Sequence, residues 1–371
     1  MARTLLISLA ALAALCACGE ERTISTPPPG FRQDVFRQEA ASKIDALWVI
    51  DNSASMQPQQ DKVRDSLSRF IATFTRGLVD YRIAVTTTDV ISDRGEFLGN
   101  PDVVTPALSD PITVFERNVL VGTGGKGHEE AFEAARLAIE RERAAASAVV
   151  AQRDSCRAAC AATGVQACSD ACDQRYVPRF MRPGAHLYLV FVSDEEEQSF
   201  GEVRYYQRLF EGALGLGNEG AVTVATICGD VPSPPCDAEP GSRYAALASA
   251  TGGIVASICD PDFDRSLETM ALDAAGLKRK FGLSRTPAPE TLKVEIRYRC
   301  DARQLSACQT LTTDCDGRTF DHEGQVCEPP LGTGSGWTLE LSTNSLFFHG
   351  DAVPGLRSTV VASYQAAEDL P

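Results

Sequence analysis

The sequence lacks several features that would place it in common functional classes. It has no excess of basic residues, because 50 Asp and Glu outnumber 35 Lys and Arg and leave a net charge of −15. Nucleic-acid-binding proteins need a basic surface, so the composition argues against that class. After the N-terminus, no apolar run reaches the about 18 residues that suggest a transmembrane helix. The 371-residue chain is nevertheless 44% hydrophobic, which is enough to bury a large core.

Motifs of common enzyme classes are missing as well. His128-Glu129 begins like the HExxH helix of zinc proteases, but Phe132 stands where the second histidine ligand belongs. No G-x-S-x-G nucleophile elbow occurs. Two of the four histidines, His322 and His349, lie near the C-terminus and leave open an exported enzyme with its site there. We expect a binding protein rather than an enzyme.

Residues 1–18 predict export. Arg3 is followed by an apolar run that is too short to span a bilayer, as in a secretory signal peptide. The run ends in Leu15-Cys16-Ala17-Cys18, which resembles the bacterial lipobox and implies that Cys18 is lipidated and becomes the mature N-terminus. An ordinary signal peptide is the alternative. Because Gly19 and not an aspartate follows Cys18, we expect attachment to the outer membrane, with residues 19–33 as a Pro-rich tether.

Short apolar runs alternate with helical patterns over residues 34–283. This alternation predicts an α/β domain, a doubly wound and mostly parallel sheet with helices on both faces. Residues 284–371 instead alternate with period two and predict a small β-rich module, with a Cys-rich insertion at 300–327. Within the first domain, strands are expected at 44–50, 82–88, 187–192, 221–227 and 253–258, and helices at 63–78, 129–141, 242–250 and 265–277.

Oxygen-bearing side chains follow two of these strands. Asp51, Ser53 and Ser55 come directly after the first strand, and Asp194 ends the strand LYLVFVS. Ligands of open α/β sheets bind beyond the carboxyl ends of the strands, so these oxygens are expected at one edge. Carboxylates and hydroxyls are hard ligands that suit Mg²⁺, Ca²⁺ or Mn²⁺. The pattern therefore predicts a divalent-cation site.

The D-x-S-x-S loop after a buried strand, with a later strand ending in Ser-Asp, resembles the von Willebrand factor type A (VWA) domain. The surrounding segments VIDNSASM and LVFVSDEEE also resemble lipoproteins of myxobacteria and related deltaproteobacteria. The VWA resemblance implies a metal-ion-dependent adhesion site in which Asp51, Ser53 and Ser55 are ligands and Asp194 contacts the metal through water. It also implies a protein partner whose carboxylate completes the coordination.

The second loop of the family should add a threonine or serine ligand shortly before a helix. Here Lys126 lies at or near that position, and its ammonium group is an electrostatic substitute for the cation. Thr123 or Glu129 is the alternative source of the missing ligand. Asp89, which ends a neighbouring strand, is expected either to orient a ligating water or to be an ordinary solvated acid. Metal binding and a site closed by Lys126 are therefore both open.

The 13 cysteines point to disulfides in an exported protein. Residues 150–178 hold two C-x₃-C pairs, which lie on one face of each of two helices joined by a Gly turn. An antiparallel helical hairpin with Cys156–Cys172 and Cys160–Cys168 disulfides is expected, with a zinc site as the competing interpretation. Cys236–Cys259 is the preferred third disulfide, which leaves Cys228 unpaired. Pairing among Cys300, Cys308, Cys315 and Cys327 stays open.

Together these observations predict a lipid-anchored protein of the outer membrane, facing the periplasm or the cell surface. Its VWA-like domain is expected to bind a protein partner through a divalent cation, and no nucleotide or nucleic acid. The alternatives are a metal-free scaffold of the cell envelope and an exported enzyme with its site in the C-terminal module.

Overall fold

The computed structural model describes residues 31–38, 43–76, 79–161, 165–215, 218–298, 319–321, 324–333, 336–349, 352–355 and 358–369. The expected signal peptide, the expected lipidation site Cys18 and most of the expected tether lie outside these residues. Among the described helices, none is long and apolar enough to cross a membrane.

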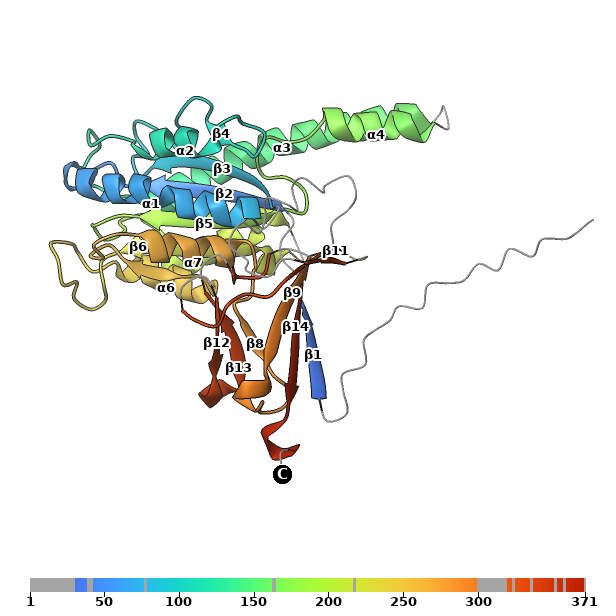
Figure 1. The fold of residues 1–371 in the computed structure, drawn as a ribbon. Helices are drawn as coiled ribbons and strands as arrows, with labels where there is room; N and C mark the ends of the chain where they lie inside the picture. The colour runs from blue at the N-terminus through green and yellow to red at the C-terminus, as the bar shows by residue number, and fades with distance from the viewer. Residues whose placement is uncertain are drawn as a thin grey trace, which may run out of the picture.

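A six-stranded sheet forms the centre of the larger domain, in the order β4-β3-β2-β5-β6-β7 (Figure 1). All neighbouring pairs are parallel except β3–β4 at the edge. The predicted fold class, a doubly wound and mostly parallel α/β sheet, is therefore confirmed. The strands are β2 (Lys43–Ile50), β3 (Asp80–Thr87), β4 (Val103–Val104), β5 (His186–Val192), β6 (Val222–Cys228) and β7 (Val255–Ser257).

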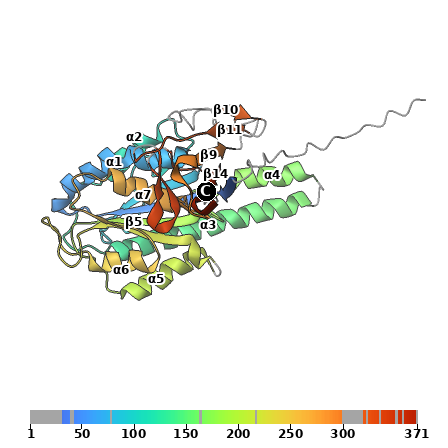
Figure 2. The same ribbon diagram turned by 60° about the horizontal axis from the view of Figure 1, so that its bottom comes forward.

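Helices cover both faces of this sheet (Figures 1 and 2). Alternate residues of β2 point to opposite faces, so Trp48 belongs to one hydrophobic cluster whereas Leu47 and Val49 belong to the other. The first cluster lies under α1 (Gln57–Arg76), α2 (Pro111–Val119) and α7 (Asp264–Ala274). The second lies under α3 (Ala131–Ala161), α5 (Val203–Glu211) and α6 (Ser242–Ala250).

The register of the sheet brings three strand ends level with one another. Ile50 pairs with Val192 of β5 on one side and with Thr87 of β3 on the other. The amide of Asp51 continues this pairing by donating to the carbonyl oxygen of Val192 at 2.9 Å. Side chains that follow β2, β3 and β5 consequently meet at one edge, where ligands of such sheets bind.

The predicted disulfide hairpin is present, but its first helix is not separate from the domain. α3 runs without a break for 31 residues and packs at its far end against α4 (Gln166–Arg175), so that both extend away from the sheet (Figure 1). Cys156–Cys172 and Cys160–Cys168 are both formed. The Cys236–Cys259 disulfide is also formed, and Cys228 is buried as a free thiol.

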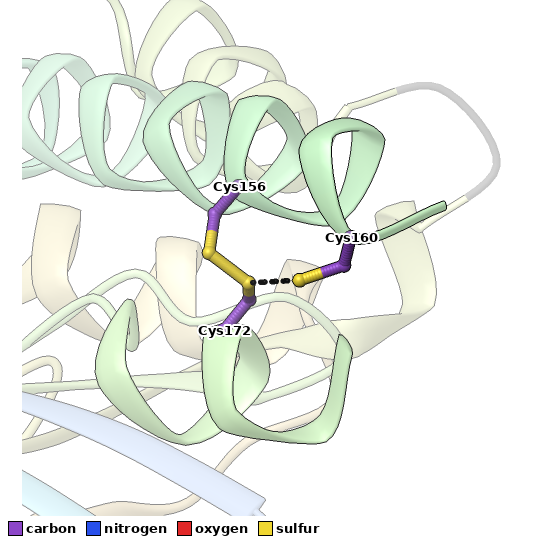
Figure 3. Close-up of side chains that lie close together, drawn as sticks. All are labelled: Cys156, Cys160 and Cys172. Atoms are coloured by element: carbon purple, nitrogen blue, oxygen red, sulfur yellow. Dashed lines mark hydrogen bonds between the residues drawn. A yellow bond between two sulfur atoms is a disulfide. The ribbon is translucent and has the colours of Figure 1, made fainter. Parts of the chain in front are cut away.

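The zinc interpretation of the hairpin cysteines is wrong. Cys156, Cys160 and Cys172 are the one group of three or more His, Cys, Asp or Glu residues, within the described part of the chain, whose ligand atoms all lie within 4.8 Å of one another. Their sulfur atoms belong to disulfides and so offer no thiolate to a metal (Figure 3).

The C-terminal module is built from two antiparallel sheets around a third hydrophobic cluster. The larger sheet has the order β1-β14-β9-β11-β10, and the smaller one β12-β13-β8. Their strands are β1 (Phe31–Arg37), β8 (Lys280–Gly282), β9 (Lys293–Tyr298), β10 (Thr319–Asp321), β11 (Gly324–Cys327), β12 (Trp337–Glu340), β13 (Ser345–Phe348) and β14 (Ser358–Gln365).

The module takes strands from both ends of the expected α/β domain. β1 overlaps the segment from residue 34, and it pairs with β14 over seven residue pairs. β8 lies before residue 283 and pairs with β13. The pairing partner of a strand is set by tertiary structure, so a division at residue 34 and residue 283 separates strands that share a sheet. Cys327 is disulfide-bonded; Cys300, Cys308 and Cys315 lie outside the described residues.

Candidate cation site at the carboxyl edge of the sheet

Asp51 is the centre of the edge and is fully buried. One of its carboxylate oxygens, Oδ1, accepts the amide of Ser53 at 2.7 Å, which is a local turn that fixes the loop after β2. The other, Oδ2, accepts the hydroxyl of Ser193 at 2.6 Å. Because Ser193 follows β5 directly, this bond joins the loops of two adjacent strands.

The two serines and Asp194 form a chain of oxygens beside Asp51. Ser53 Oγ lies 3.1 Å from Ser55 Oγ, and Ser55 Oγ donates to Asp194 Oδ1 at 3.1 Å. Adjacent ligands of an octahedral ion with metal–oxygen bonds of about 2.1 Å are about 3 Å apart, so the spacing suits a shared ion. The sequence-predicted set of Asp51, Ser53, Ser55 and Asp194 is thus brought together by the fold.

Glu129 enters the same site from the loop before α3. Its side chain is fully buried, and its Oε2 accepts the hydroxyl of Thr88, the residue that follows β3. Its Oε1 is buried without a hydrogen-bond partner. Burial, reinforced by the nearby charge of Asp51, raises the pKa of Glu129 to about 8. A buried carboxylate with a free oxygen lacks compensation, which a cation at Oε1 would supply.

Contacts to the loop after β5 hold Glu129 in place. The carbonyl oxygen of Glu129 accepts the amide of Gln198 at 2.8 Å. At the start of α3, the amide of Phe132 donates to Glu197 at 3.2 Å. Glu197 is itself buried and paired with Arg243 at 2.8 Å. The carboxylate of Glu197 therefore occupies the N-terminal end of α3, where a helix dipole favours negative charge.

Neither Thr123 nor Lys126 joins this cluster. The loop that carries them is fixed by the amide of Gly125, which donates to the carbonyl oxygen of Asn52 at 2.8 Å. Thr123 is half-buried and Lys126 is exposed, and within the described residues neither side chain forms a hydrogen bond or an ion pair. Of the two alternatives for the missing ligand, the structure therefore places Glu129, and not Thr123, beside Asp51. Lys126 is exposed and forms no ion pair with a described carboxylate, although its charge lowers the pKa of Asp89.

Asp89 stabilises its own loop. Its Oδ1 accepts the amides of Ile91 and Ser92 at 2.9 and 2.8 Å, and its Oδ2 accepts the hydroxyl of Ser92 at 2.8 Å. Burial alone would raise the pKa of Asp89, but the bonds from Ser92 and Ile91 and the nearby charge of Lys126 hold it below its usual value. Three of the four lone-pair directions are used and the side chain is buried, so Asp89 caps its own loop and is not a solvated acid.

The edge is strongly acidic. Burial, with the charge of Asp51, raises the pKa of Asp194, and the same two causes raise the pKa of Glu195. Carboxylates that lie together ionise only when a cation or a proton neutralises them. The carboxylates of Asp51 and Glu129, the latter with its free Oε1, and the hydroxyls of Ser53 and Ser55 are the oxygen ligands that a hard divalent ion prefers. Asp194 would act from behind Ser55.

Two residues of this site were not among the sequence-predicted candidates. Ser193 and Thr88 each donate a hydroxyl hydrogen bond to a buried carboxylate of the cluster. Both directly follow a strand, so strand ends at one edge were the signal that would have found them.

Comparison with known proteins gives only distant likeness. No protein-family model matches the chain, and no curated protein matches it. Among solved structures, a von Willebrand factor type A protein from Catenulispora acidiphila aligns over 92% of this chain and 66% of its own length, at 13% identity and a TM-score of 0.35. BatB from Bacteroides thetaiotaomicron aligns over 63% of this chain and 98% of its own, at 11% identity and a TM-score of 0.34.

A third similar structure is proximal thread matrix protein 1 of the mussel byssus, described with a zinc-occupied MIDAS motif. It aligns over 65% of this chain and 48% of its own length, at 11% identity and a TM-score of 0.36. This chain thus covers less than two thirds of the Catenulispora protein and about half of the mussel protein. At these TM-scores and identities, the neighbours carry no argument about the activity of this chain.

Proposed function

We propose that this protein is a cell-envelope lipoprotein whose α/β domain binds a divalent cation and, through it, a carboxylate of a partner protein. Cys18 is its lipid attachment site and the outer membrane its location. One observation carries the proposal: a buried glutamate, Glu129, has a carboxylate oxygen that accepts no hydrogen bond, and the charge of Asp51 acts on this glutamate. Such an arrangement is costly unless an ion completes it.

Asp51, Glu129, Ser53 and Ser55 would hold the ion, and Asp194 would stand behind Ser55. The bound ion supplies a positive charge on which a partner's carboxylate binds. Ser55 is exposed while Asp51 and Glu129 are buried, so the open side of the site faces solvent on the Ser55 side. A partner would therefore approach over the exposed loop that follows β2.

Calorimetric titration of the purified protein with Mg²⁺, Ca²⁺ and Mn²⁺ tests the ion. Binding heat is expected for the native chain and not for Asp51→Asn, which keeps the shape of the side chain. Asp89→Asn is the matched control, because it removes a carboxylate of the same edge that caps its own loop. Equal heats for native protein and Asp51→Asn would exclude the site. A pull-down from envelope extract with and without chelator then tests the partner.

A metal-free scaffold is the second candidate, and one observation favours it. The raised pKa of Glu129 means that a proton, held between the carboxyl groups of Glu129 and Asp51, is an alternative to the cation. Absence of ion binding in the titration would select this candidate. The third candidate function is that of an exported enzyme with its site in the C-terminal module, and it was suggested by His322 and His349. His349 is hydrogen-bonded to Thr338 at 2.9 Å, and His322 lies outside the described residues.

A further inference from the structure

A surface pocket lies next to the loop that carries Glu129. Glu129 and Glu130 are consecutive, so their Cα atoms are about 3.8 Å apart. Glu129 is buried beside Asp51, whereas Glu130 is half-buried and lines the pocket. The pocket, with a volume of about 680 Å³, therefore begins one residue along the chain from Glu129, although none of the proposed cation ligands lines it. Its walls include Val90, Glu130, Arg136, Leu137, Phe200 and Tyr205.

The rim of the pocket is aromatic. Phe200 is fully exposed and Tyr205 is 53% exposed. The chain packs tightly just beyond Phe200, because a Cβ atom on Gly201 would lie 2.9 Å from the rings of both Tyr205 and Tyr206. This packing fixes the backbone that presents the phenyl ring to solvent. Exposed rings at a concave site suit an aliphatic chain, and their faces also attract a cation.

The charge available in the pocket is negative. The charge of Arg136 is already compensated, since its Nε and Nη2 donate to Glu133 at 2.9 and 2.5 Å and its Nη1 donates to Glu140 at 2.6 Å. The carboxylate of Glu130, by contrast, has no hydrogen bond or ion pair with any described residue. An anionic occupant would therefore meet an unpaired carboxylate and an arginine that is already neutralised.

We propose that this pocket binds a lysine or arginine side chain of the partner protein, within a few residues of the carboxylate that the cation binds. The aliphatic stem would lie between Val90, Leu137 and the rings, and the charged end would meet Glu130. The position of the pocket relative to the cation rests on the proposed function. The preference for a basic side chain rests on the pocket alone.

Methyl-labelled protein and two synthetic peptides test this inference. The peptides Gly-Lys-Gly-Asp-Gly and Gly-norleucine-Gly-Asp-Gly differ only in the ammonium group. In saturating Ca²⁺, the methyl signals of Val90 and Leu137 are expected to shift with the lysine peptide, which binds about tenfold more tightly than the norleucine peptide. Glu130→Gln should weaken the lysine peptide about three- to fivefold. Glu202→Gln, which removes an exposed charge outside the pocket lining, should leave it unchanged.

Equal affinity of the two peptides, or unshifted Val90 and Leu137 methyls, would overturn the pocket proposal. Because the peptide comparison uses native protein, it stands even where Glu130→Gln fails to fold. Repeating it in chelator separates the two proposals. If lysine preference persists while total affinity is unchanged by chelator, the pocket stands and the cation bridge fails. If chelator weakens both peptides equally and norleucine binds as well as lysine, the bridge stands and the pocket fails.

Discussion

Replacement of Glu129 by glutamine should raise the free energy of unfolding when no cation is present and lower it when a cation is bound. The pKa of Glu129 is raised from 4.5 to about 8 because the side chain is buried beside Asp51. A tenfold change in proton affinity corresponds to about 1.4 kcal/mol, so ionised Glu129 costs the metal-free protein on the order of 5 kcal/mol. Glutamine has the same shape without the charge, and its amide can donate toward Asp51.

The direction with pH follows from the raised pKa. Glu129 binds its proton more tightly in the folded than in the unfolded chain. Protonated Glu129 therefore contributes fully to the stability of the metal-free protein below about pH 4.5, and this contribution is lost as the pH rises through about 8. In chelator at pH 9, Glu129→Gln is therefore expected to be the more stable protein. In saturating Ca²⁺ or Mg²⁺ the order is expected to reverse, because the variant has lost a buried carboxylate ligand; at pH 9 this requires that it bind the ion at least about several thousandfold more weakly than the native chain.

Urea unfolding at pH 6 and pH 9, with chelator and with excess cation, measures this reversal. Glu130→Gln is the matched control, since it removes the same charge one residue further along from a half-buried position. This control should show neither the higher stability in chelator at pH 9 nor the weaker stabilisation by cation that are expected of Glu129→Gln. A Glu129→Gln protein that is less stable than the native chain in chelator at pH 9, or equally responsive to cation, would refute the reasoning.

Three further predictions concern other parts of the molecule. Asp51→Asn should abolish the rise in melting temperature that cation produces, whereas Asp89→Asn should keep that rise and lower the melting temperature in both conditions; identical behaviour of the two variants would contradict the assignment. Replacing Cys160 and its partner by serine should destabilise the hairpin by about 2.5 kcal/mol, from the closure entropy of its short loop. Limited proteolysis should then cut the hairpin before the sheet domain unfolds, and simultaneous loss of both would show that the hairpin is not independent. Asp45→Ala should cost about 3 kcal/mol in urea unfolding, because Asp45 and Arg182 are both buried and pair at 2.8 Å; a loss below about 1 kcal/mol would show that the second ion pair of Arg182, with Asp80 at 2.7 Å, is sufficient.

Elements whose pattern is local were predictable from the sequence. The strand around Trp48 is an unbroken apolar run, as a strand buried on both faces must be, and residues 63, 67, 70 and 74 recur at helical spacing. The hairpin disulfides followed from C-x₃-C spacing, because residues four apart lie on one face of a helix. Asp51 and Asp194 were expected together because both follow buried parallel strands.

Other features depend on contacts between distant segments. Thr123, Lys126 and Glu129 lie within seven residues of one another, and the spacing alone did not decide which side chain faces Asp51. The choice is made by Thr88 and by Gln198, which anchor Glu129 from two other strand ends. In the same way, β1 was not among the strands expected from the sequence, and only its pairing with β14 assigns it to the C-terminal module.

The sequence by itself determined the alternation of strands and helices, the acidic and hydroxyl residues at the strand ends, and the cysteine pairs. Each of these follows from backbone periodicity or from the chemistry of neighbouring residues. Only the tertiary structure decided that Glu129 is buried with an unpartnered oxygen and that Glu130 beside it faces an aromatic pocket. Burial and unpaired charge are properties of what surrounds a side chain, and those surroundings come from residues far apart in the chain.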